Sequence, residues 1–269
     1  MRTLRTIAEI RGALEPLRAG RTIGLVPTMG AFHDGHAALF HAARHECGLV
    51  VASLFVNPSQ FGDAADLASY PRDENRDQRI AAEAGVDLLF SPANAEMYPP
   101  GYSTWVDVGG PARGLEGDFR PGHFRGVATI CLKLFTIVRP HLVFFGQKDA
   151  QQVAVVKRMI CDLNLEVAIR VLPTVRDADG LALSSRNVRL SAEERRRALA
   201  IPRAIAAGAA AHRDGGDPVA AARAELGDVE AEYVALADLE GALTLAIAAR
   251  IGSTRLIDNV PLGGRGDRA

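Results

Sequence analysis

The feature that most constrains the fold is an alternation of short apolar runs with a helical pattern early in the chain. Residues 22–27 are apolar, an alanine-rich helical pattern follows over 33–47, and residues 49–56 are apolar again. A strand, a helix and a strand with short connections form a βαβ unit, which implies a parallel sheet flanked by helices. The sequence therefore predicts an α/β protein.

The same alternation continues to about residue 172. Apolar positions at helical spacing predict a helix over 3–18, and the later patterns predict helices over 73–84, 124–138 and 151–163. Strands are expected at 86–90, 142–145 and 167–172, with a short one at 105–108. Residues 111–123 combine glycine, proline and mixed charge, so we expect a mobile loop there.

The pattern changes after Pro173. Helices are expected over 192–211 and 217–226, followed by strands at 232–236 and 254–260 that an apolar segment, 243–251, connects. We therefore expect two domains, residues 1–175 and a smaller α+β domain of residues 176–269. The polar tail, 263–269, is expected to be frayed.

Charge and cysteine usage restrict the possible partners and the compartment. The formal net charge is −1, which favours neither nucleic acid nor an anionic membrane. The sequence contains no run of 18 apolar residues, and residues 1–15 alternate charged with apolar side chains, so we expect neither a spanning helix nor a secretory signal. Cys47, Cys131 and Cys161 are far apart among apolar neighbours and are expected to be buried thiols of a cytoplasmic protein.

The first candidate site is the turn between the first strand of the βαβ unit and its helix, Pro27-Thr28-Met29-Gly30-Ala31-Phe32-His33-Asp34-Gly35-His36. A helix N-terminus has unpaired N–H groups and a partial positive charge, which attract phosphate, and two imidazoles one turn apart can donate to phosphate oxygens. Two alternatives stay open. The histidines only cap the helix, or they join His41 and His45 in a zinc site.

The second candidate is residues 144–152, at the C-terminal end of a predicted strand, where open α/β sheets bind ligands. Lys148 supplies a compact positive charge, and it is one of three lysines among 31 basic residues. Asp149 could orient this lysine or hold a metal ion, and Gln152 could meet a polar substrate. The alternative is a solvated loop with a chance ion pair.

The third candidate is residues 179–187, just past the expected domain boundary. The hydroxyls of Ser184 and Ser185 beside Arg186 suit a phosphate clamp. The alternative is a turn before a helix cap, because Ser191 and Glu194 have the spacing of a capping box.

The fourth candidate is residues 55–61, at the end of the second predicted strand. The amides of Asn57 and Gln60 are of the type that recognises hydroxyls and carboxylates in a pocket. The alternative is a common Asn-Pro turn.

Six segments in this order resemble the pantothenate synthetase (pantoate–β-alanine ligase) family, and the likeness covers nearly the whole chain. They are Pro-Thr-Met-Gly with the His-Asp-Gly-His signature at 27–36, and residues 57–61, 70–72, 123–127, 146–149 and 184–187. The first and last signatures also resemble class I aminoacyl-tRNA synthetases and nucleotidyltransferases, which implies a Rossmann-like sheet. Leu183 stands where the family commonly has methionine. We expect little consequence, because this side chain should act only through its bulk.

The resemblance implies a two-step reaction. The pantoate carboxylate attacks the α-phosphorus of ATP, giving pantoyl-adenylate and pyrophosphate, and the amine of β-alanine then displaces AMP. It also implies Mg²⁺ on the phosphates with Asp149 nearby, a homodimer, and small molecules as the only other partners. Because the adenylate is prone to hydrolysis, we expect the C-terminal domain and the 111–123 loop to close over the site.

The resemblance also assigns roles to residues. Stabilisation of negative charge is expected from His36, His33, Lys148, Ser184, Ser185 and Arg186, with His36 as a phosphate donor and not as a base. Contacts with ATP are expected from Met29, Gly30, Ala31, Phe32, His33, Asp34, Gly35, His36, Gly146, Gln147, Lys148, Asp149, Val175, Leu183, Ser184, Ser185 and Arg186. Pro27, Thr28, Asn57, Gln60 and Gln152 are expected to bind substrate, and no site for a protein-held metal is expected.

Three other functions compete. A nucleotidylyltransferase acting on a phosphorylated alcohol would share the histidine signature, but it has no reason to keep Asn57, Gln60 and Gln152 for a second acceptor. A metal-binding or nucleotide-sensing protein would use the histidine cluster. A tRNA synthetase is disfavoured by the small size and by the absence of a basic anticodon-binding domain.

Overall fold

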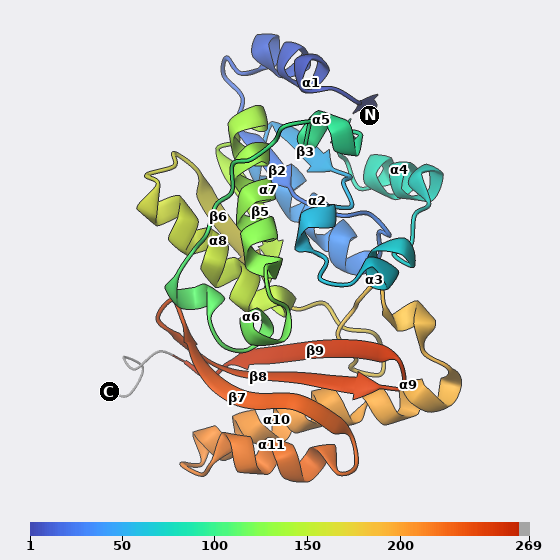
Figure 1. Cartoon of the computed structure of the whole chain (residues 1–269), viewed down its shortest axis with the longest axis vertical. Helices are drawn as coiled ribbons and strands as arrows, with labels where there is room; N and C mark the ends of the chain where they lie inside the picture. The colour runs from blue at the N-terminus through green and yellow to red at the C-terminus, as the bar shows by residue number, and fades with distance from the viewer. Residues whose placement is uncertain (264–269) are drawn as a thin grey trace. The chain divides into compact units, whose positions relative to one another are not determined.

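The computed structural model describes residues 1–263 and contains two sheets (Figure 1). The strands are β1 (Arg2–Leu4), β2 (Ile23–Val26), β3 (Leu49–Ser53), β4 (Leu88–Phe90), β5 (Leu142–Gly146), β6 (Ala168–Leu172), β7 (Glu230–Leu239), β8 (Ala242–Ile251) and β9 (Thr254–Pro261). The α-helices are α1 (Ile7–Leu14), α2 (Asp34–Glu46), α3 (Ala64–Ala68), α4 (Glu74–Glu83), α5 (Asn94–Met97), α6 (Glu116–Phe119), α7 (His123–Val138), α8 (Ala150–Asp162), α9 (Ala192–Ala198), α10 (Ala200–Arg213) and α11 (Pro218–Leu226). The short 3₁₀ helices are η1 (Glu15–Leu17), η2 (Pro58–Gln60), η3 (Gly110–Ala112), η4 (Gln147–Asp149) and η5 (Asn187–Arg189).

Contacts divide the chain into two compact units, which we describe separately. Unit 1 consists of Met1–Gly146 and Val155–Leu172. Unit 2 consists of Gln147–Ala154 and the chain from Pro173 onward. These units differ from the domains expected from the sequence in residues 147–154 and 173–175, which belong to unit 2.

Unit 1 contains a six-stranded parallel sheet in the order β1-β4-β3-β2-β5-β6. The strand order reverses at β2, which pairs with β3 on one side and with β5 on the other. In open parallel sheets, ligands bind at the carboxyl ends of the strands beside such a reversal. The candidate turn at 27–36 directly follows β2, and Gly146 is the last residue of β5.

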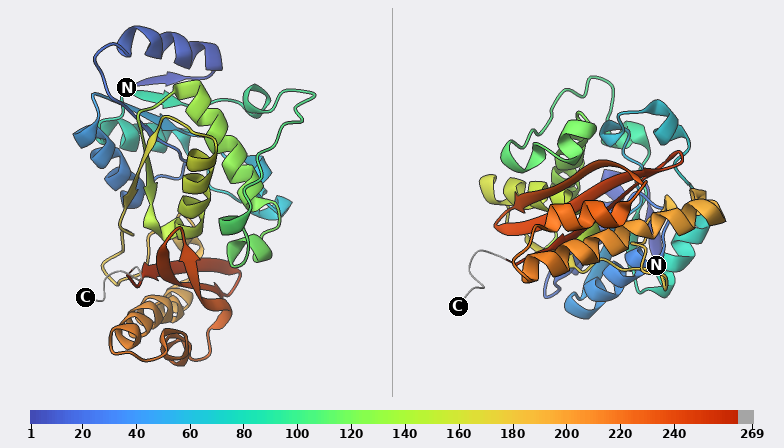
Figure 2. Two further views of the ribbon diagram at one scale, coloured as in Figure 1. Left: turned by 90° about the vertical axis from the view of Figure 1, so that its left-hand side faces the viewer. Right: turned by 90° about the horizontal axis from the view of Figure 1, so that it is seen from below.

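Helices cover both faces of this sheet, with α2 on one face and α7 on the other (Figure 2). Under α2, a fully buried core includes Phe32, Phe40 and Phe144. A capping box between Thr6 and Glu9 starts α1, which the sequence had predicted to begin at residue 3. The expected α/β fold with a parallel sheet is confirmed.

Unit 2 contains the antiparallel sheet β7-β8-β9. The helices α10 and α11 pack on one face of this sheet, where α10 contacts β8 and β9 and α11 contacts β7 (Figure 1). A core of aliphatic side chains lies between helices and sheet and includes Ile201, Leu245 and Ile247. The smaller α+β part expected from the sequence is therefore present.

Several expected elements were wrong. Residues 2–4 form the strand β1 and not the start of a helix, because they pair with β4. Residues 105–108 form no strand, whereas the apolar segment expected to be a connection is the central strand β8. The expected helix over 192–211 is two helices, α9 and α10. Residues 111–123 were expected to be a mobile loop; they contain the helical turn α6, in which Glu116 is buried, and their mobility stays a prediction.

The predicted cysteine environment was correct for two of the three residues. Cys47 and Cys131 are buried, and burial raises the pKa of the Cys131 thiol to about 12. Cys161 is exposed because it lies on the outer side of α8, one turn after the exposed Lys157. The tail expected to be frayed lies outside the described residues after Gly263.

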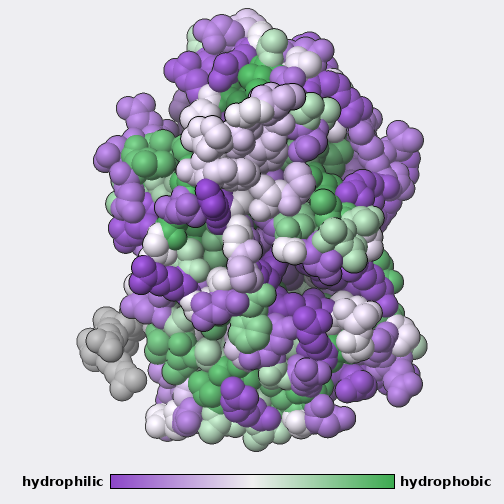
Figure 3. Space-filling model, viewed as in Figure 1, coloured by the Kyte–Doolittle hydropathy of each residue, from purple (hydrophilic) through white to green (hydrophobic). Residues whose placement is uncertain are grey.

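On the face shown in Figure 3, hydrophilic residues separate the hydrophobic ones. Within the described part of the chain, we find no helix with the length and apolar character needed to cross a membrane.

Candidate functional site

In unit 1, the turn after β2 is fixed to the neighbouring strand. Thr28 donates its hydroxyl hydrogen bond to the Ser53 carbonyl oxygen, and its N–H donates to Ser53 Oγ at 3.0 Å. Gly30 has φ of +87°, and a Cβ there would lie 2.6 Å from Leu54 Cδ1. Only glycine suits this backbone and this space, so the turn can bend sharply towards α2.

A buried carboxylate that the sequence analysis missed holds this turn. Asp77 of α4 is 1% exposed, and its two oxygens accept hydrogen bonds from the N–H groups of Ala31 at 2.8 Å and Phe32 at 2.7 Å. Burial raises the pKa of Asp77, against the lowering effect of these two hydrogen bonds. One signal was available, because Asp77 lies on the same helical face as Ala81 and Ala84, and both are buried.

The two signature histidines form a reciprocal cap at the start of α2. The Gly35 N–H donates to His33 Nδ1 at 3.1 Å, and the His33 N–H donates to His36 Nδ1 at 3.3 Å. The ring centroids lie 4.2 Å apart. An Nδ1 that accepts a hydrogen bond carries no proton, so each neutral ring has its proton on Nε2. Both side chains therefore have an Nε2–H donor.

The same hydrogen bonds argue against the alternative that His33 and His36 bind zinc. A metal ligand must offer a ring nitrogen without a proton. In both rings Nδ1 is already used by a backbone N–H, and Nε2 carries the proton. Among the described residues, no three His, Cys, Asp or Glu side chains are grouped as metal ligands would be.

Asn57 and Gln60 come together after β3. Asn57 is 1% exposed, and its Nδ2 donates to Gln60 Oε1 at 2.9 Å and to the Gly126 carbonyl at 3.2 Å. Its Oδ1 accepts from the Ser59 and Tyr98 hydroxyls, each at 2.8 Å. Every polar side-chain atom of Asn57 is thus engaged, whereas Gln60 Nε2 has no acceptor among the described residues. Asn57 therefore orients Gln60, whose Nε2 can donate to a ligand.

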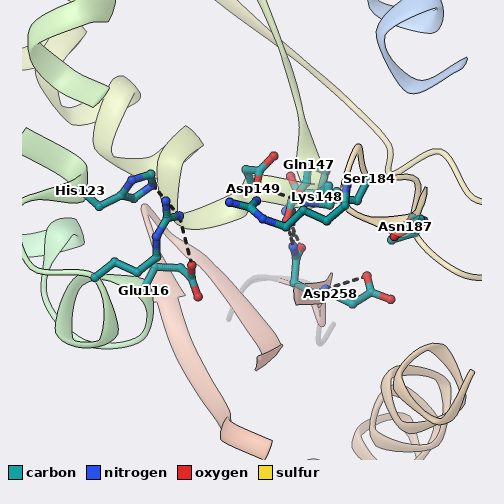
Figure 4. Close-up of polar contacts among 12 residues, drawn as sticks. Glu116, His123, Gln147, Lys148, Asp149, Ser184, Asn187 and Asp258 are labelled. Carbon is teal, nitrogen blue, oxygen red and sulfur yellow. Dashed lines mark hydrogen bonds and ion pairs between the residues drawn. The ribbon is translucent and has the colours of Figure 1, made fainter. Parts of the chain in front are cut away.

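A second network holds the backbone of Gln60, and Figure 4 shows two of its members, His123 and Glu116. The buried His123 contacts the Gln60 carbonyl oxygen through Nδ1 at 2.9 Å and Arg120 through Nε2 at 3.1 Å. Because the guanidinium can only donate, Nδ1 of His123 carries the proton. Glu116 lies 3.6 Å from the same guanidinium. Sequence analysis assigned no role to these three side chains.

In unit 2, Lys148 lies in the turn η4 that follows β5 along the chain (Figure 4). Its Nζ lies 3.4 Å from Asp149 Oδ1, and the side chains are 20% and 46% exposed. Gln152 follows on α8, and its amide has no hydrogen-bond partner within the described chain. Lysine and glutamine thus offer donors one helical turn apart.

The predicted serine and arginine segment follows a small hairpin in unit 2. The Leu183 N–H donates to the Val175 carbonyl at 3.0 Å, and Arg176 pairs with Ala182. Beyond the hairpin, Ser184 Oγ accepts from the Arg186 N–H at 3.2 Å. The expected capping box of Ser191 and Glu194 is present at α9.

The other predicted site residues lie in three segments already described: the turn before α2, the end of β5 with η4, and the hairpin with the serine segment. Phe32 is fully buried, so its ring belongs to the core. Asp34 is exposed on the first turn of α2. Partial burial is shared by Pro27, Met29, Ala31, Gly35, Gly146, Gln147, Val175, Leu183, Ser185 and Arg186.

Comparisons with known proteins agree on one family. The model of the family described as pantoate-beta-alanine ligase matches residues 2–261. The pantothenate synthetase of Heliobacterium modesticaldum is 50% identical, over 97% of this chain and 99% of that protein. The crystal structure of pantothenate synthetase from Thermus thermophilus covers 97% of this chain and 99% of its own, at 45% identity and a TM-score of 0.92.

A third relative carries ligands. The pantoate-beta-alanine ligase of Francisella tularensis was solved as a complex with Beta-gamma ATP and β-alanine. It is 33% identical, has a TM-score of 0.85, and covers 97% of this chain and 98% of its own.

Proposed function

The chain belongs to the pantoate–β-alanine ligase family, and from that premise we propose how its residues act. The reaction joins pantoate to β-alanine at the expense of ATP. A carboxylate oxygen of pantoate bonds to the α-phosphorus, and the bond to the pyrophosphate oxygen breaks. The β-alanine nitrogen then bonds to the acyl carbon, AMP leaves, and the nitrogen loses a proton as the amide forms.

His33 and His36 act as hydrogen-bond donors to ATP phosphates. The support is their shared tautomer, in which Nδ1 accepts a backbone N–H and Nε2 carries the proton. A ring in this state donates well and is a poor base at Nε2. Charge that develops on the phosphate during adenylation is stabilised by such preorganised donors. The N-terminus of α2 adds a partial positive charge.

Unit 2 contributes the cationic groups. We assign Lys148, Ser184, Ser185 and Arg186 to the phosphates, since ammonium, hydroxyl and guanidinium groups suit phosphate oxygens. The single, partly exposed carboxylate of Asp149 fits a Mg²⁺ ion that comes with the triphosphate, because Mg²⁺ keeps several waters and takes few protein ligands there. Bound Mg²⁺ would neutralise part of the phosphate charge.

Gln60 and Gln152 bind pantoate in this proposal. Their amide groups are without protein acceptors among the described residues, and amides suit hydroxyls and a carboxylate. We assign Asn57 the role of holding Gln60, since its own atoms are engaged. If the protein were a nucleotidylyltransferase, the amides of Gln60 and Gln152 would have no second acceptor substrate to bind. A homodimer and a cytoplasmic location are further proposals, supported by the family likeness and by cysteines that form no disulfide among the described residues.

The family match over residues 2–261 carries the function, and one exchange assay tests it. Labelled pyrophosphate should enter ATP when pantoate is present and β-alanine is absent, because adenylation is reversible. Chelation of Mg²⁺ should stop the exchange, and added Mg²⁺ should restore it. Addition of β-alanine should then release AMP and pantothenate. Folded, ATP-binding protein without exchange would favour the nucleotidylyltransferase alternative.

A further inference from the structure

The turn that carries Lys148 is held by one amide side chain from the far end of the chain. Asn259 of β9 is 6% exposed. Its Nδ2 donates to the carbonyl oxygens of Gln147 at 3.0 Å and Lys148 at 2.8 Å, and its Oδ1 accepts from Gln147 Nε2 at 3.2 Å. All of these residues belong to unit 2.

Only an amide can make this set of contacts. Its two N–H groups meet two consecutive carbonyl oxygens, which fixes the planes of both peptide groups around Lys148. With these planes fixed, the direction in which the lysine side chain leaves the backbone is fixed too. A carboxylate in the same place would bring its oxygens against the carbonyl oxygens and could donate to neither.

The strand beneath Asn259 is itself held in place. The neighbouring Asp258, labelled in Figure 4, is 2% exposed and binds both terminal nitrogens of Arg176, at 2.7 and 3.0 Å. Its Oδ1 also accepts the Asn259 N–H at 2.8 Å. Successive side chains of a strand point to opposite faces. One face of β9 therefore holds the hairpin of Arg176, and the other holds the turn of Lys148.

We propose that Asn259 is a positioning residue, which orients Lys148 for its action on ATP. This inference rests on the proposed role of Lys148. Asn259 itself touches no reacting atom. Its contribution is the rigid support that a catalytic side chain needs, since a misplacement of about 1 Å can cost on the order of 10²-fold in rate.

The test is a double-mutant cycle in the full chain, with pantoate-dependent pyrophosphate exchange as the readout. Asn259→Ala should lower the exchange rate by on the order of 10- to 10²-fold at saturating ATP. In a Lys148→Ala background the same change should have almost no further effect, because two residues that act as a unit are not additive. Asn259→Asp, which keeps the shape, should be as damaging as alanine.

A matched control separates positioning from folding. Leu256→Ala removes a core side chain from the same strand, on the face of Asp258, and its effect should be the same in both backgrounds. If Asn259→Ala does not fold, Asn259→Asp replaces it in the cycle, and Asn259→Ser replaces both if needed. Equal losses from the Asn259 change with and without Lys148 would overturn the inference. Wild-type exchange by Lys148→Ala would instead contradict the proposed role of the lysine.

Discussion

Single side chains set the electrostatics of the proposed site, and Lys148 offers the most direct test. Its ammonium group lies 3.4 Å from Asp149 Oδ1 and is partly buried. Removal of one preorganised donor costs on the order of 10²–10³ in rate. We therefore expect Lys148→Ala to lower kcat for adenylation by that factor while the fold persists. Lys157→Ala, at an exposed position later in α8, is the matched control and should keep wild-type turnover.

A second residue-scale prediction concerns Asp77. In Asp77→Asn the side chain keeps its size, but its NH₂ group meets an N–H of the turn before α2, so one of two backbone donors loses its acceptor. An unsatisfied buried group costs about 1–3 kcal/mol. Because the turn precedes His33, we also expect kcat to fall by on the order of 10². Unchanged kinetics in this variant would show that the turn does not depend on the carboxylate.

The same carboxylate predicts a pH dependence of stability. The pKa of Asp77 is raised above its ordinary value of 3.8, chiefly by burial. Between that value and the folded-state pKa, the folded protein holds a proton that the unfolded chain has lost. Stability then falls as pH rises. The free energy of unfolding of the wild type minus that of Asp77→Asn should decrease across this window and become constant above it. Denaturant titrations of both proteins from pH 4 upward measure this difference in the free energy of unfolding. A difference that grows with pH would contradict the raised pKa.

At the scale of single residues, the sequence indicated candidate site residues but not the buried side chains that hold their backbone in place. The histidines, Lys148 and the serine segment stand in short motifs, so adjacent positions were enough to propose them, and their roles stay predictions. Asp77 and Asn259 act on backbone groups that are 45 or more and 111 or more positions away. No pattern in the neighbouring sequence identifies such a partner, because only the folded structure brings the two segments together.

Among the elements, α7 approaches η2 closely beside Gln60, which is proposed to bind pantoate. A Cβ on Gly126 would lie 2.4 Å from the Ser59 carbonyl oxygen and 2.7 Å from the Gln60 N. Both are backbone atoms, so η2 must move. We expect Gly126→Ala to raise KM for pantoate at least tenfold and to cost about 1–3 kcal/mol of stability, as overpacking does. The affinity for ATP, measured by calorimetry, should change little.

Gly12 supplies the control for that substitution. It also lies inside a helix, α1, but a Cβ there meets no atom within 4 Å. Gly12→Ala should leave KM unchanged and stabilise the protein by up to about 1 kcal/mol, since alanine favours a helix interior. If Gly126→Ala behaves in the same way, the close approach of α7 does not position Gln60.

The elements also show where a pattern in the sequence becomes ambiguous. The strands β2 and β3 are buried on both faces and were predicted from short apolar runs with helical patterns between them. The strand β8 is also largely buried, but its sequence is rich in alanine, and strands instead of helices precede and follow it in the chain. It was therefore expected to be a connection. The three residues of β1 are too few to produce a periodic signal, and only their pairing with β4 makes them a strand.

Each unit has a hydrophobic core of its own, and the residues proposed to act on the substrates come from both units. Unit 1 carries the histidines and the amide of Gln60, and unit 2 carries Lys148, Gln152 and the serine and arginine segment. Chain order alone would assign residues 147–154 to the larger part. Their contacts with β9 are what make them part of unit 2, and these contacts link the lysine to the last strand.

The largest-scale prediction concerns water. Pantoyl-adenylate would be lost to hydrolysis in an open site, so we expect residues 111–123 to become protected when the adenylate forms. Arg113 in this segment is exposed, so the bond after Arg113 is the one to follow with trypsin. ATP with pantoate should slow cleavage there more than ATP alone, as followed by mass spectrometry.

Ligands also stabilise a whole protein by mass action, and this effect has to be separated from local closure. Cleavage after the exposed Arg213, at the end of α10, reports on global and unit 2 opening. Local closure requires that protection after Arg113 exceed protection after Arg213. Equal protection at both bonds would mean that substrates only stabilise the fold. No protection after Arg113, in protein that catalyses exchange, would mean that another segment excludes water from the adenylate.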